Sequence, residues 1–135
     1  MTDCLFCKII RKEIPAEIVY EDEAAIVFVD IKPINPGHLL VVPKEHAADF
    51  ASASDEAVRA AAIVAKKMGK AVMEAFQAPA FNLGVNNGRA AGQLVDHLHL
   101  HVIPRFENDG HAHWHGGAYA EGEMQEVAER LKSVL

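Results

Sequence analysis

The sequence predicts an α+β fold, in which an antiparallel sheet packs against one long central helix. Short runs of apolar and β-branched residues form two groups, one before and one after a long segment whose apolar residues keep helical spacing. The connections between neighbouring runs are short, which favours antiparallel pairing. Strands that gather around one helix in this way are typical of the α+β class.

The composition is that of a single globular domain, which we expect to span residues 1–135. Half of the residues are hydrophobic and 24% are charged, as is usual for globular proteins. The net charge of −6 gives no sign of nucleic-acid binding. No run approaches the roughly 18 apolar residues of a membrane span, and no basic and apolar leader is recognisable at the N-terminus. We therefore expect a cytoplasmic protein with no nucleic-acid or membrane partner.

The first half of the chain is expected to form a short helix followed by three strands. CLFCKIIRKE places its apolar side chains on adjoining faces of a helix from about Asp3 to Glu13, which Pro15 closes. The segment IKPINPG is rich in turn-forming residues and separates the last two strands. The three strands are expected at Ile18–Tyr20, Ala25–Val29 and His38–Val42.

The second half begins with the clearest helix, from Ser52 to Phe76. Either Ser52 or Ser54 can cap it, and two acidic residues suit its first turn electrostatically. The elements expected after it are a strand at Phe81–Val85, a Gly-containing loop at Asn86–Gly92, a strand at Leu94–Ile103, a His- and Gly-rich loop at Asn108–Gly117 and a terminal helix at Glu121–Val134.

The most informative stretch is DHLHLHVIPR, residues 96–105. In a strand, residues i, i+2 and i+4 share a face, so His97, His99 and His101 are expected on one side and the leucines between them on the other. Pro104 is expected to stop the strand. A solvent-facing strand more often carries Thr, Lys or Glu, so the three histidines indicate a functional site.

Two kinds of site fit these histidines. An H-x-H pair can supply two ligands to a catalytic metal, although Asp96 is the one carboxylate close to it in sequence. Alternatively, a neutral imidazole attacks phosphorus and forms a phosphohistidine, while its neighbours move protons near neutral pH. The residues by themselves leave both interpretations open.

The pattern H-φ-H-φ-H-φ-φ, where φ is apolar, is the signature of the histidine triad (HIT) family, and HLHLHVI fits it without a mismatch. FCKIIRKEIPAEIVYEDE, AIVFVDIKPINPGHLLVVPK and NNGRAAGQ precede it in the order and at the spacing of that family. The chain therefore resembles the HIT family over nearly its whole length, and most of all the Hint-type branch of nucleoside phosphoramidate hydrolases. The resemblance implies the HIT fold and a homodimer whose sheets join across the subunit interface.

The resemblance implies an enzyme that cleaves purine nucleoside 5′-phosphoramidates. His99 matches the middle triad histidine, which attacks the α-phosphorus and forms a nucleotidyl-histidine. His101 would help to hold the phosphate and handle protons, and His97 would support the strand and loop geometry. His38, in PGHLLVVPK, matches an upstream partner of the triad, and without the resemblance it would equally be a histidine at the start of a strand.

The resemblance also implies a purine nucleotide site. Asp30 matches the residue that binds the ribose hydroxyls, a role that suits a charged acceptor, although by itself it reads as a turn residue. Asn86 and Gln93 match polar positions that contact the phosphate or the leaving group. Leu94 stands where many Hint-type members have Ser or Thr, which leaves the leaving-group preference open. The apolar walls of the purine pocket match Phe6, Ile9, Phe28 and Ile31.

Two other functions remain open. One is cleavage of dinucleoside polyphosphates, because the Pro104–Arg105 pair that follows the triad also occurs in the polyphosphate-cleaving branch of the family. The other is a nucleotide-binding scaffold with little catalysis, against which the complete triad argues.

The pair Cys4 and Cys7 forms a lone C-x-x-C, a weak sign of metal or redox chemistry. A subset of bacterial HIT proteins binds a structural zinc with such a pair, a histidine after the VVPK-like strand and the first triad histidine. These positions hold His46 and His97, so the resemblance implies a possible zinc site without a catalytic role. Reduced thiols or a reversible disulfide are the alternatives. The loop with Trp114 equally fits a rim that covers the site across a dimer. The rival ligands in that loop are His111, His113 and His115.

Overall fold

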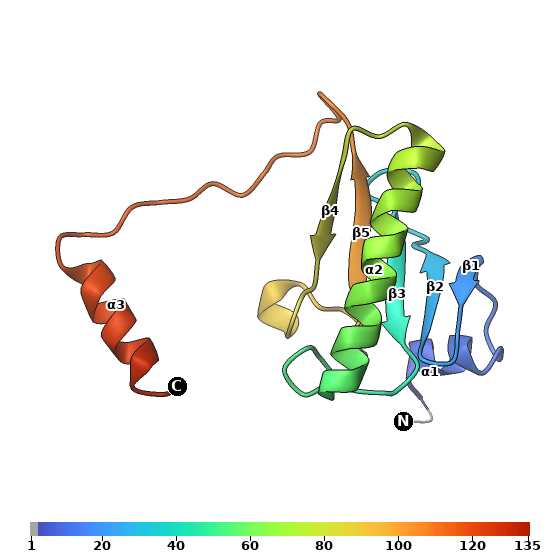
Figure 1. Cartoon of the computed structure of the whole chain (residues 1–135), viewed down its shortest axis with the longest axis horizontal. Coiled ribbons are helices and arrows are strands. Elements are labelled where there is room, and N and C mark those ends of the chain that lie inside the picture. Colours follow the sequence, from blue (N-terminus) through green and yellow to red (C-terminus); the bar gives the residue numbers. More distant parts are fainter. Residues whose placement is uncertain (1–2) are drawn as a thin grey trace.

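The computed structural model describes residues 3–135 and has the predicted α+β fold (Figure 1). One five-stranded antiparallel sheet has the strand order β1-β2-β3-β5-β4. Its strands are β1 (Ile18–Glu21), β2 (Ala25–Val29), β3 (Leu39–Pro43), β4 (Ala80–Gly84) and β5 (Leu100–Arg105). The helices are α1 (Leu5–Ile10), α2 (Asp55–Phe76) and α3 (Glu123–Lys132), with a 3-10 turn at Arg89–Ala91.

The sheet separates two apolar layers. Successive residues of a strand point to opposite faces, so β2 and β3 contribute alternate side chains to each layer. The layer between α2 and the sheet contains Ala25, Val27, Leu39, Val41, Ala65, Met68, Leu98, Leu100 and Val102. The layer between α1 and the sheet contains Phe6, Ile9, Ile26, Phe28, Leu40 and Val42. Helix α2 therefore covers one face of the sheet (Figure 1), and the other face is left for α1 and the predicted site.

The helix predicted at Ser52–Phe76 forms, but it begins at Asp55. Ser54 is the cap, because its Oγ accepts a hydrogen bond from the Ala57 N–H at 3.1 Å. Ser52 lies in the preceding turn, where its N–H donates to Asp49 Oδ1 at 2.9 Å. Of the two serines that could cap the helix, Ser54 is therefore the cap, because Ser52 is engaged in the turn with Asp49.

Helix α1 is shorter than the predicted Asp3–Glu13, and Pro15 does not close it. Lys12 adopts a left-handed conformation with φ of 64°. The Glu13 N–H then donates to Lys8 O at 2.9 Å, and the Lys12 N–H donates to Ile9 O at 3.0 Å. This is a Schellman ending, which satisfies the last helical carbonyls, and it ends the helix at Ile10.

The strand predicted at Leu94–Ile103 begins only at Leu100, so the prediction was wrong at its start. Ladder pairing with β3 reaches Leu100 opposite Val41. Before that point the Leu98 N–H donates to Ala47 O at 2.8 Å, in the segment after β3. Two of the three histidines therefore precede the strand.

Pro104 does not stop β5, which ends at Arg105. The ladder between β3 and β5 finishes with Leu39 opposite Val102, whereas Pro104 pairs with Phe81 of β4. The Pro104 carbonyl points to the β3 side and accepts from Asn35 Nδ2 at 2.9 Å. In a strand the N–H and the C=O of one residue point to the same side. An N–H at position 104 would therefore point toward β3, where the ladder between β3 and β5 has already ended, so proline removes no ladder hydrogen bond.

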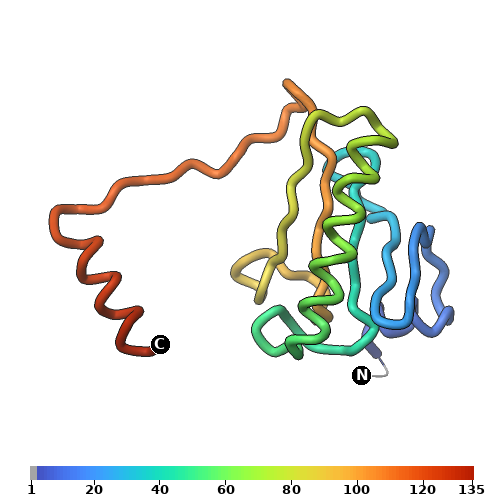
Figure 2. Tube along the Cα trace, viewed as in Figure 1, coloured from blue at the N-terminus to red at the C-terminus, as the bar shows by residue number. Residues whose placement is uncertain are grey.

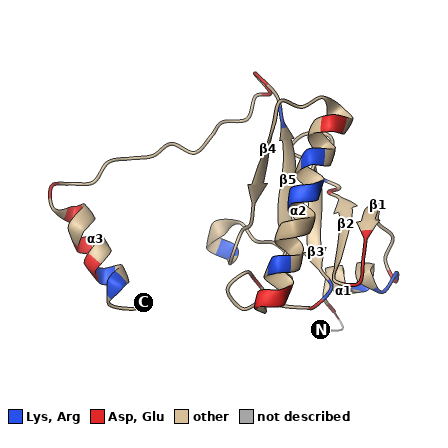
Figure 3. Ribbon diagram, viewed as in Figure 1, with Lys and Arg blue, Asp and Glu red and all other residues tan. Residues whose placement is uncertain are grey.

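The strand predicted at Phe81–Val85 is β4, shifted by one residue, and the terminal helix predicted at Glu121–Val134 is the shorter α3. Figures 1 and 2 show α3 apart from the sheet, at the end of an extended segment. Acidic residues lie in its first turn and basic residues in its last (Figure 3), an arrangement that the helix dipole favours. No helix among the described residues has the length and hydropathy needed to cross a membrane. A single domain over residues 1–135 stays a prediction, and Met1 and Thr2 lie outside the described residues.

Candidate functional site

The three histidines lie on the sheet face that α2 does not cover. Leu98 belongs to the apolar layer between α2 and the sheet. The Phe6 ring of α1 lies edge-on to the rings of His97 and His99, with centroids 6.0 and 5.1 Å apart. The centroids of His99 and His101 are 5.1 Å apart. The predicted separation of histidines from leucines is confirmed, although only the last histidine is part of β5.

His99 is oriented by the backbone. Its Nδ1 lies 2.7 Å from the carbonyl oxygen of His97. A carbonyl oxygen only accepts hydrogen bonds, so Nδ1 carries a hydrogen, and in the neutral ring Nε2 keeps its lone pair. The His99 ring is buried and borders the hollow described below. An imidazole in this tautomer can act as a nucleophile.

His38 and His101 form a second, oppositely arranged pair. The Ile34 N–H donates to His38 Nδ1 at 3.0 Å, so His38 carries its hydrogen on Nε2. This atom lies 2.9 Å from His101 Nδ1, which must therefore accept. Neutral His101 then has its hydrogen on Nε2 and is a hydrogen-bond donor.

Burial keeps both of these imidazoles neutral. It lowers the pKa of His101 to about 4, an effect that nearby His99 and His38 reinforce. Burial also lowers the pKa of His38, although the charge of Asp30 acts in the opposite direction. The Asp30 carboxylate lies 3.5 Å from His38 Nε2. At neutral pH both rings are therefore neutral, and the His101 Nε2–H is available as a hydrogen-bond donor.

A hollow of about 430 Å³ lies beside His99 and His101, within the size range of small-molecule sites. Part of its wall is apolar, and there the rings of Phe6 and Phe28 meet edge-to-face with centroids 5.3 Å apart. Asp30 lies at its border. The predicted residues that line it are Phe6, Ile9, Phe28, Asp30, Ile31, Asn86, His99 and His101. The structure adds apolar lining from Leu5, Ile14, Leu40 and Val95.

Two predicted nucleotide contacts are placed differently from the rest. The Ile31 side chain is 92% exposed, so it belongs to the rim of the hollow and not to its wall. Gln93 does not line the hollow. Its Nε2 donates to Ala48 O and Val95 O, and its Oε1 accepts from the Gly88 N–H. The buried amide therefore holds the loop that carries Asn86, instead of pointing toward a ligand.

Cys4, Cys7, His46 and His97 converge, with their ligand atoms within 4.8 Å of one another. His46 Nδ1 and His97 Nδ1 are 3.1 Å apart. Cys4 Sγ lies 3.3 Å from His97 Nδ1, and Cys7 Sγ lies 3.4 Å from His46 Nδ1. Ordinary zinc bond lengths imply tetrahedral edges of about 3.3 Å between nitrogens and about 3.6 Å between nitrogen and sulfur. The four residues fit a zinc ion.

The chemistry of the donors points the same way. His97 Nε2 lies 2.8 Å from Pro43 O and must donate to it, so the Nδ1 lone pair faces the two sulfurs. Both cysteines are free thiols, and burial, followed by the neighbouring Cys4, raises the pKa of Cys7. A bound cation would reverse that preference, because zinc stabilises thiolates.

The rival ligands do not join this cluster. Among the described residues, the one other group able to hold a metal is Asp30, His38 and His101. The two imidazoles of that group already share a hydrogen bond. His111, His113 and His115 are exposed and belong to neither group. His99 also stands outside both, which does not favour a catalytic H-x-H metal site.

Comparison with protein families and curated proteins finds consistent matches. Residues 11–108 match the family model of the HIT domain. The chain is 47% identical over 114 residues to a HIT-like protein of Methanocaldococcus jannaschii, covering 79% of this chain and 82% of that protein. It is 42% identical over 102 residues to the adenosine 5′-monophosphoramidase of Schizosaccharomyces pombe, covering 76% and 74%. It is 41% identical over 107 residues to an adenylylsulfatase of Arabidopsis thaliana, covering 79% and 54%.

Solved structures give the same result. The crystal structure of a HIT family member from Bacillus subtilis superposes with a TM-score of 0.90 at 35% identity, covering 98% of this chain and 97% of that one. A Zn-bound histidine triad family protein from Mycobacterium smegmatis superposes with a TM-score of 0.79 at 34% identity, covering 99% of each chain.

Proposed function

The chain belongs to the HIT family of nucleotide-binding hydrolases, and from this premise we propose that it cleaves purine nucleoside 5′-phosphoramidates through a nucleotidyl-His99 intermediate. The observation that carries the proposal is the pair of tautomers at the hollow: His99 presents an Nε2 lone pair, and His101 presents an Nε2–H donor. A nucleophile beside a donor for phosphate oxygens is what phosphoryl-group transfer requires.

The hollow supports the nucleoside part of the substrate. A purine base fits between the apolar walls that Phe6, Ile9 and Phe28 provide. Asp30 is the acceptor for the ribose hydroxyls, since a carboxylate makes strong hydrogen bonds to neutral donors. Asn86, which lines the hollow together with His101, is a contact for the phosphate. This arrangement brings the α-phosphorus to His99.

The chemical steps then follow from the two imidazoles. His99 Nε2 attacks the α-phosphorus, and the bond from phosphorus to the leaving nitrogen breaks with its electron pair on nitrogen, which takes up a proton from solvent. The positive charge that forms on the His99 ring is stabilised by the His97 carbonyl at Nδ1. The His101 Nε2–H holds a phosphate oxygen as negative charge builds up there. Water next attacks phosphorus and gives up a proton to solvent, and the bond between phosphorus and His99 Nε2 breaks with its electron pair on nitrogen, which frees neutral His99 and the nucleoside monophosphate.

Zinc has a structural role in this proposal. An ion held by Cys4, Cys7, His46 and His97 would join α1 to the segment that carries the triad, with no open coordination position for substrate. The relative from Mycobacterium smegmatis is described as Zn-bound, which supports zinc as the metal.

The leaving group is the open part of the proposal. The relative from Schizosaccharomyces pombe is named for an amine leaving group, and the relative from Arabidopsis for sulfate. A dinucleoside polyphosphate would instead release a nucleotide. His101 and Asn86 also border a second hollow of about 690 Å³, which offers room for such a group. Comparing kcat/KM on the three substrate types ranks them.

The proposal includes a cytoplasmic homodimer. In the described chain the outer edge of β4 has no strand partner, and an exposed edge can pair with a second copy. Light scattering on the purified protein is expected to give twice the chain mass of 14.7 kDa. A mass of one chain at micromolar concentration would exclude the dimer.

Adenosine 5′-phosphoramidate hydrolysis tests the catalytic assignment. Wild type is expected to release AMP, and His99→Asn to lose about a thousandfold or more in kcat, because the nucleophile itself is removed. AMP binding, measured by calorimetry, serves as the control and is expected to persist in the variant. An active His99→Asn enzyme would exclude His99 as the nucleophile.

A further inference from the structure

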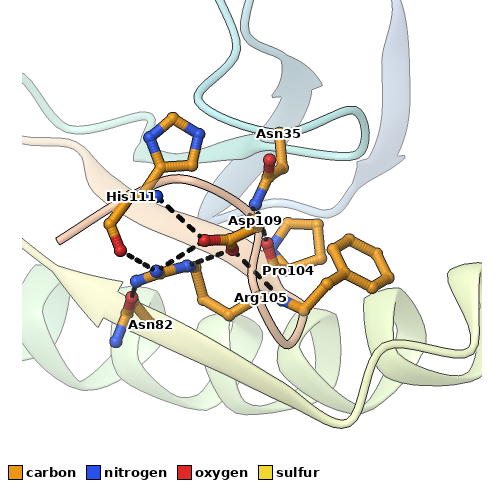
Figure 4. Close-up of polar contacts among 7 residues, drawn as sticks. Asn35, Asn82, Pro104, Arg105, Asp109 and His111 are labelled. Carbon is orange, nitrogen blue, oxygen red and sulfur yellow. Dashed lines mark hydrogen bonds and ion pairs between the residues drawn. The ribbon is translucent and has the colours of Figure 1, made fainter. Parts of the chain in front are cut away.

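The carboxylate of Asp109, in the loop after β5, collects five hydrogen bonds (Figure 4). Arg105 donates from Nε at 2.7 Å and from Nη2 at 3.0 Å. Asn35 Nδ2 donates at 3.0 Å, and the Phe106 and His111 N–H groups donate at 3.2 and 3.1 Å. The Asp109 and Arg105 side chains are 7% and 12% exposed. Every partner is a donor, so an ionised carboxylate suits the position and an amide does not.

Electrostatics agree with this geometry. The Arg105 guanidinium lowers the pKa of Asp109 well below its usual range, and the backbone N–H groups and Asn35 act in the same direction. Asp109 is therefore charged at neutral pH. None of this network lines the hollow beside Phe6 and His99, so it has no contact with the proposed nucleoside site.

Asn35 connects this network to the hydrogen-bonded pair of His38 and His101. It is 8% exposed, and its amide gives one hydrogen to Pro104 O and the other to Asp109 Oδ2. The main-chain carbonyl of Asn35 accepts from the His38 N–H at 3.0 Å. In the same turn, the Ile34 N–H makes the bond that fixes the tautomer of His38. The turn that orients His38 is thus fastened to the end of β5 by one side chain.

We propose that Asp109 and Arg105, through Asn35, are positioning residues for His38 and therefore for the His101 donor. The network holds the turn at residues 34–38 against β5, which keeps the Ile34 N–H on His38 Nδ1 and the His38 Nε2–H on His101 Nδ1. Loss of the network lets the turn move and disorders the donor, although the network residues themselves do not line the nucleoside hollow. The effect on catalysis rests on the proposed function, whereas the effect on His38 does not.

The test compares Asn35→Ala and Asp109→Asn with a matched control, Asp22→Asn. Asp22 is also a turn aspartate, which accepts from Tyr20 Oη and from the Ala24 and Ala25 N–H groups, but it has no contact with the His38 turn. Nitrogen-15 NMR of the imidazole rings reads the tautomer of His38 directly. Wild type and Asp22→Asn are expected to show an unprotonated Nδ1 and a protected Nε2–H. Both network variants are expected to lose that protected proton.

Kinetics provide the second readout. A displaced catalytic group costs about tenfold to a hundredfold in rate, so kcat on adenosine 5′-phosphoramidate is expected to fall by that factor in both network variants. AMP affinity is expected to fall by a smaller factor than kcat, because none of the network residues lines the nucleoside hollow. Arg105 also borders the second hollow, so a fall in rate could come from a lost contact between Arg105 and the leaving group. The NMR signal of the His38 ring separates that cause from a loss of positioning.

An unchanged His38 signal in folded Asn35→Ala and Asp109→Asn would overturn the inference. If both variants fail to fold, Arg105→Lys keeps the charge but removes the paired bonds to Asp109, and it is expected to weaken the same NMR signal. An unchanged signal there would also overturn it. If wild type hydrolyses no phosphoramidate, the proposed function fails, and the NMR comparison still decides whether the network positions His38.

Discussion

At the residue scale, the chemistry depends on which ring nitrogen of each histidine carries the hydrogen. Three of the four relevant rings are fixed by backbone groups: His97 by Pro43 O, His99 by His97 O and His38 by the Ile34 N–H. His101 is then fixed by His38. Because backbone partners hold them, these tautomers exist before any ligand binds, which is the preorganisation that charge stabilisation requires.

The pH dependence of stability follows from the buried His101. Its pKa of about 4 in the folded protein is lower than in the unfolded chain, where histidine titrates near 6.5. The unfolded state therefore binds more protons between these values, and stability falls as the pH drops from about 6.5 to 4. The ring contributes at most about 3 kcal/mol to this loss.

Urea unfolding at pH 7.0 and 4.5 measures this effect, with wild type and His101→Asn side by side. Both proteins are kept in a chelator, so that loss of zinc at low pH does not contribute. Wild type is expected to lose more stability on acidification than the variant does. Equal losses would show that His101 is not the group responsible.

Asp30 is expected to act on nucleoside affinity. Asp30→Asn removes a charged acceptor for the ribose hydroxyls, and a hydrogen bond to a charged group contributes about 1.5–3 kcal/mol. Calorimetry is expected to show AMP binding weakened by about tenfold or more. A 2′,3′-dideoxy analogue is the control, since it cannot make the bond and should bind both proteins alike. Equal weakening for both ligands would contradict a ribose contact.

At the scale of elements, α2 and β4 approach closely because Gly69 has no side chain. A Cβ at this position would lie 2.3 Å from Phe81 Cζ. Gly69→Ala would favour an isolated helix by about 1 kcal/mol, but here overpacking should outweigh that gain and destabilise the protein by about 1–3 kcal/mol. Thermal unfolding checks the sign. In a Phe81→Ala background the same change is expected to be neutral or stabilising, and a loss of the same size there would exclude this contact as the cause.

The elements also show what the sequence could predict. Strand β2 has its predicted bounds, whereas β3, predicted at His38–Val42, is shifted by one residue, and α2, predicted from Ser52, begins at Asp55. All three are found because their apolar periodicity reflects burial. The start of β5 could not be predicted, because residues before Leu100 bond to the segment after β3. The end of β5 depends on Asn35, which replaces the missing ladder at Pro104. Such bonds join residues distant in sequence and leave no local pattern.

The candidate site divides in the same way. The triad, His38 and the metal cluster follow from spacing and resemblance, and the structure brings them together. The structure places Gln93 in the loop interior, where three protein groups use its amide. The Asp109 network had no signal in the sequence, since Asn35, Arg105 and Asp109 are ordinary turn or strand-end residues until the fold joins them.

At the scale of the whole molecule, a zinc ion held by Cys4, Cys7, His46 and His97 would tie α1 to the triad segment. The purified protein is expected to contain one zinc ion per chain by elemental analysis, and Cys7→Ser to contain far less. Because the cluster joins α1 to the core, its loss is expected to cost about 2 kcal/mol or more, roughly 5–10 °C in Tm. The kcat of the remaining folded protein should change little, since the ion has no open position. Zinc-free protein with unchanged Tm would rule out the structural role.

The most direct test of the catalytic account is to trap the covalent intermediate. Wild type is mixed rapidly with adenosine 5′-phosphoramidate, quenched with base to preserve phosphohistidine, digested and examined by mass spectrometry. We expect an adenylyl group on the peptide that contains His99, with fragmentation placing it on that ring, and no adduct in His99→Asn. Rapid AMP release with no adduct at any time, or an adduct on another histidine, would contradict a nucleotidyl-His99 mechanism.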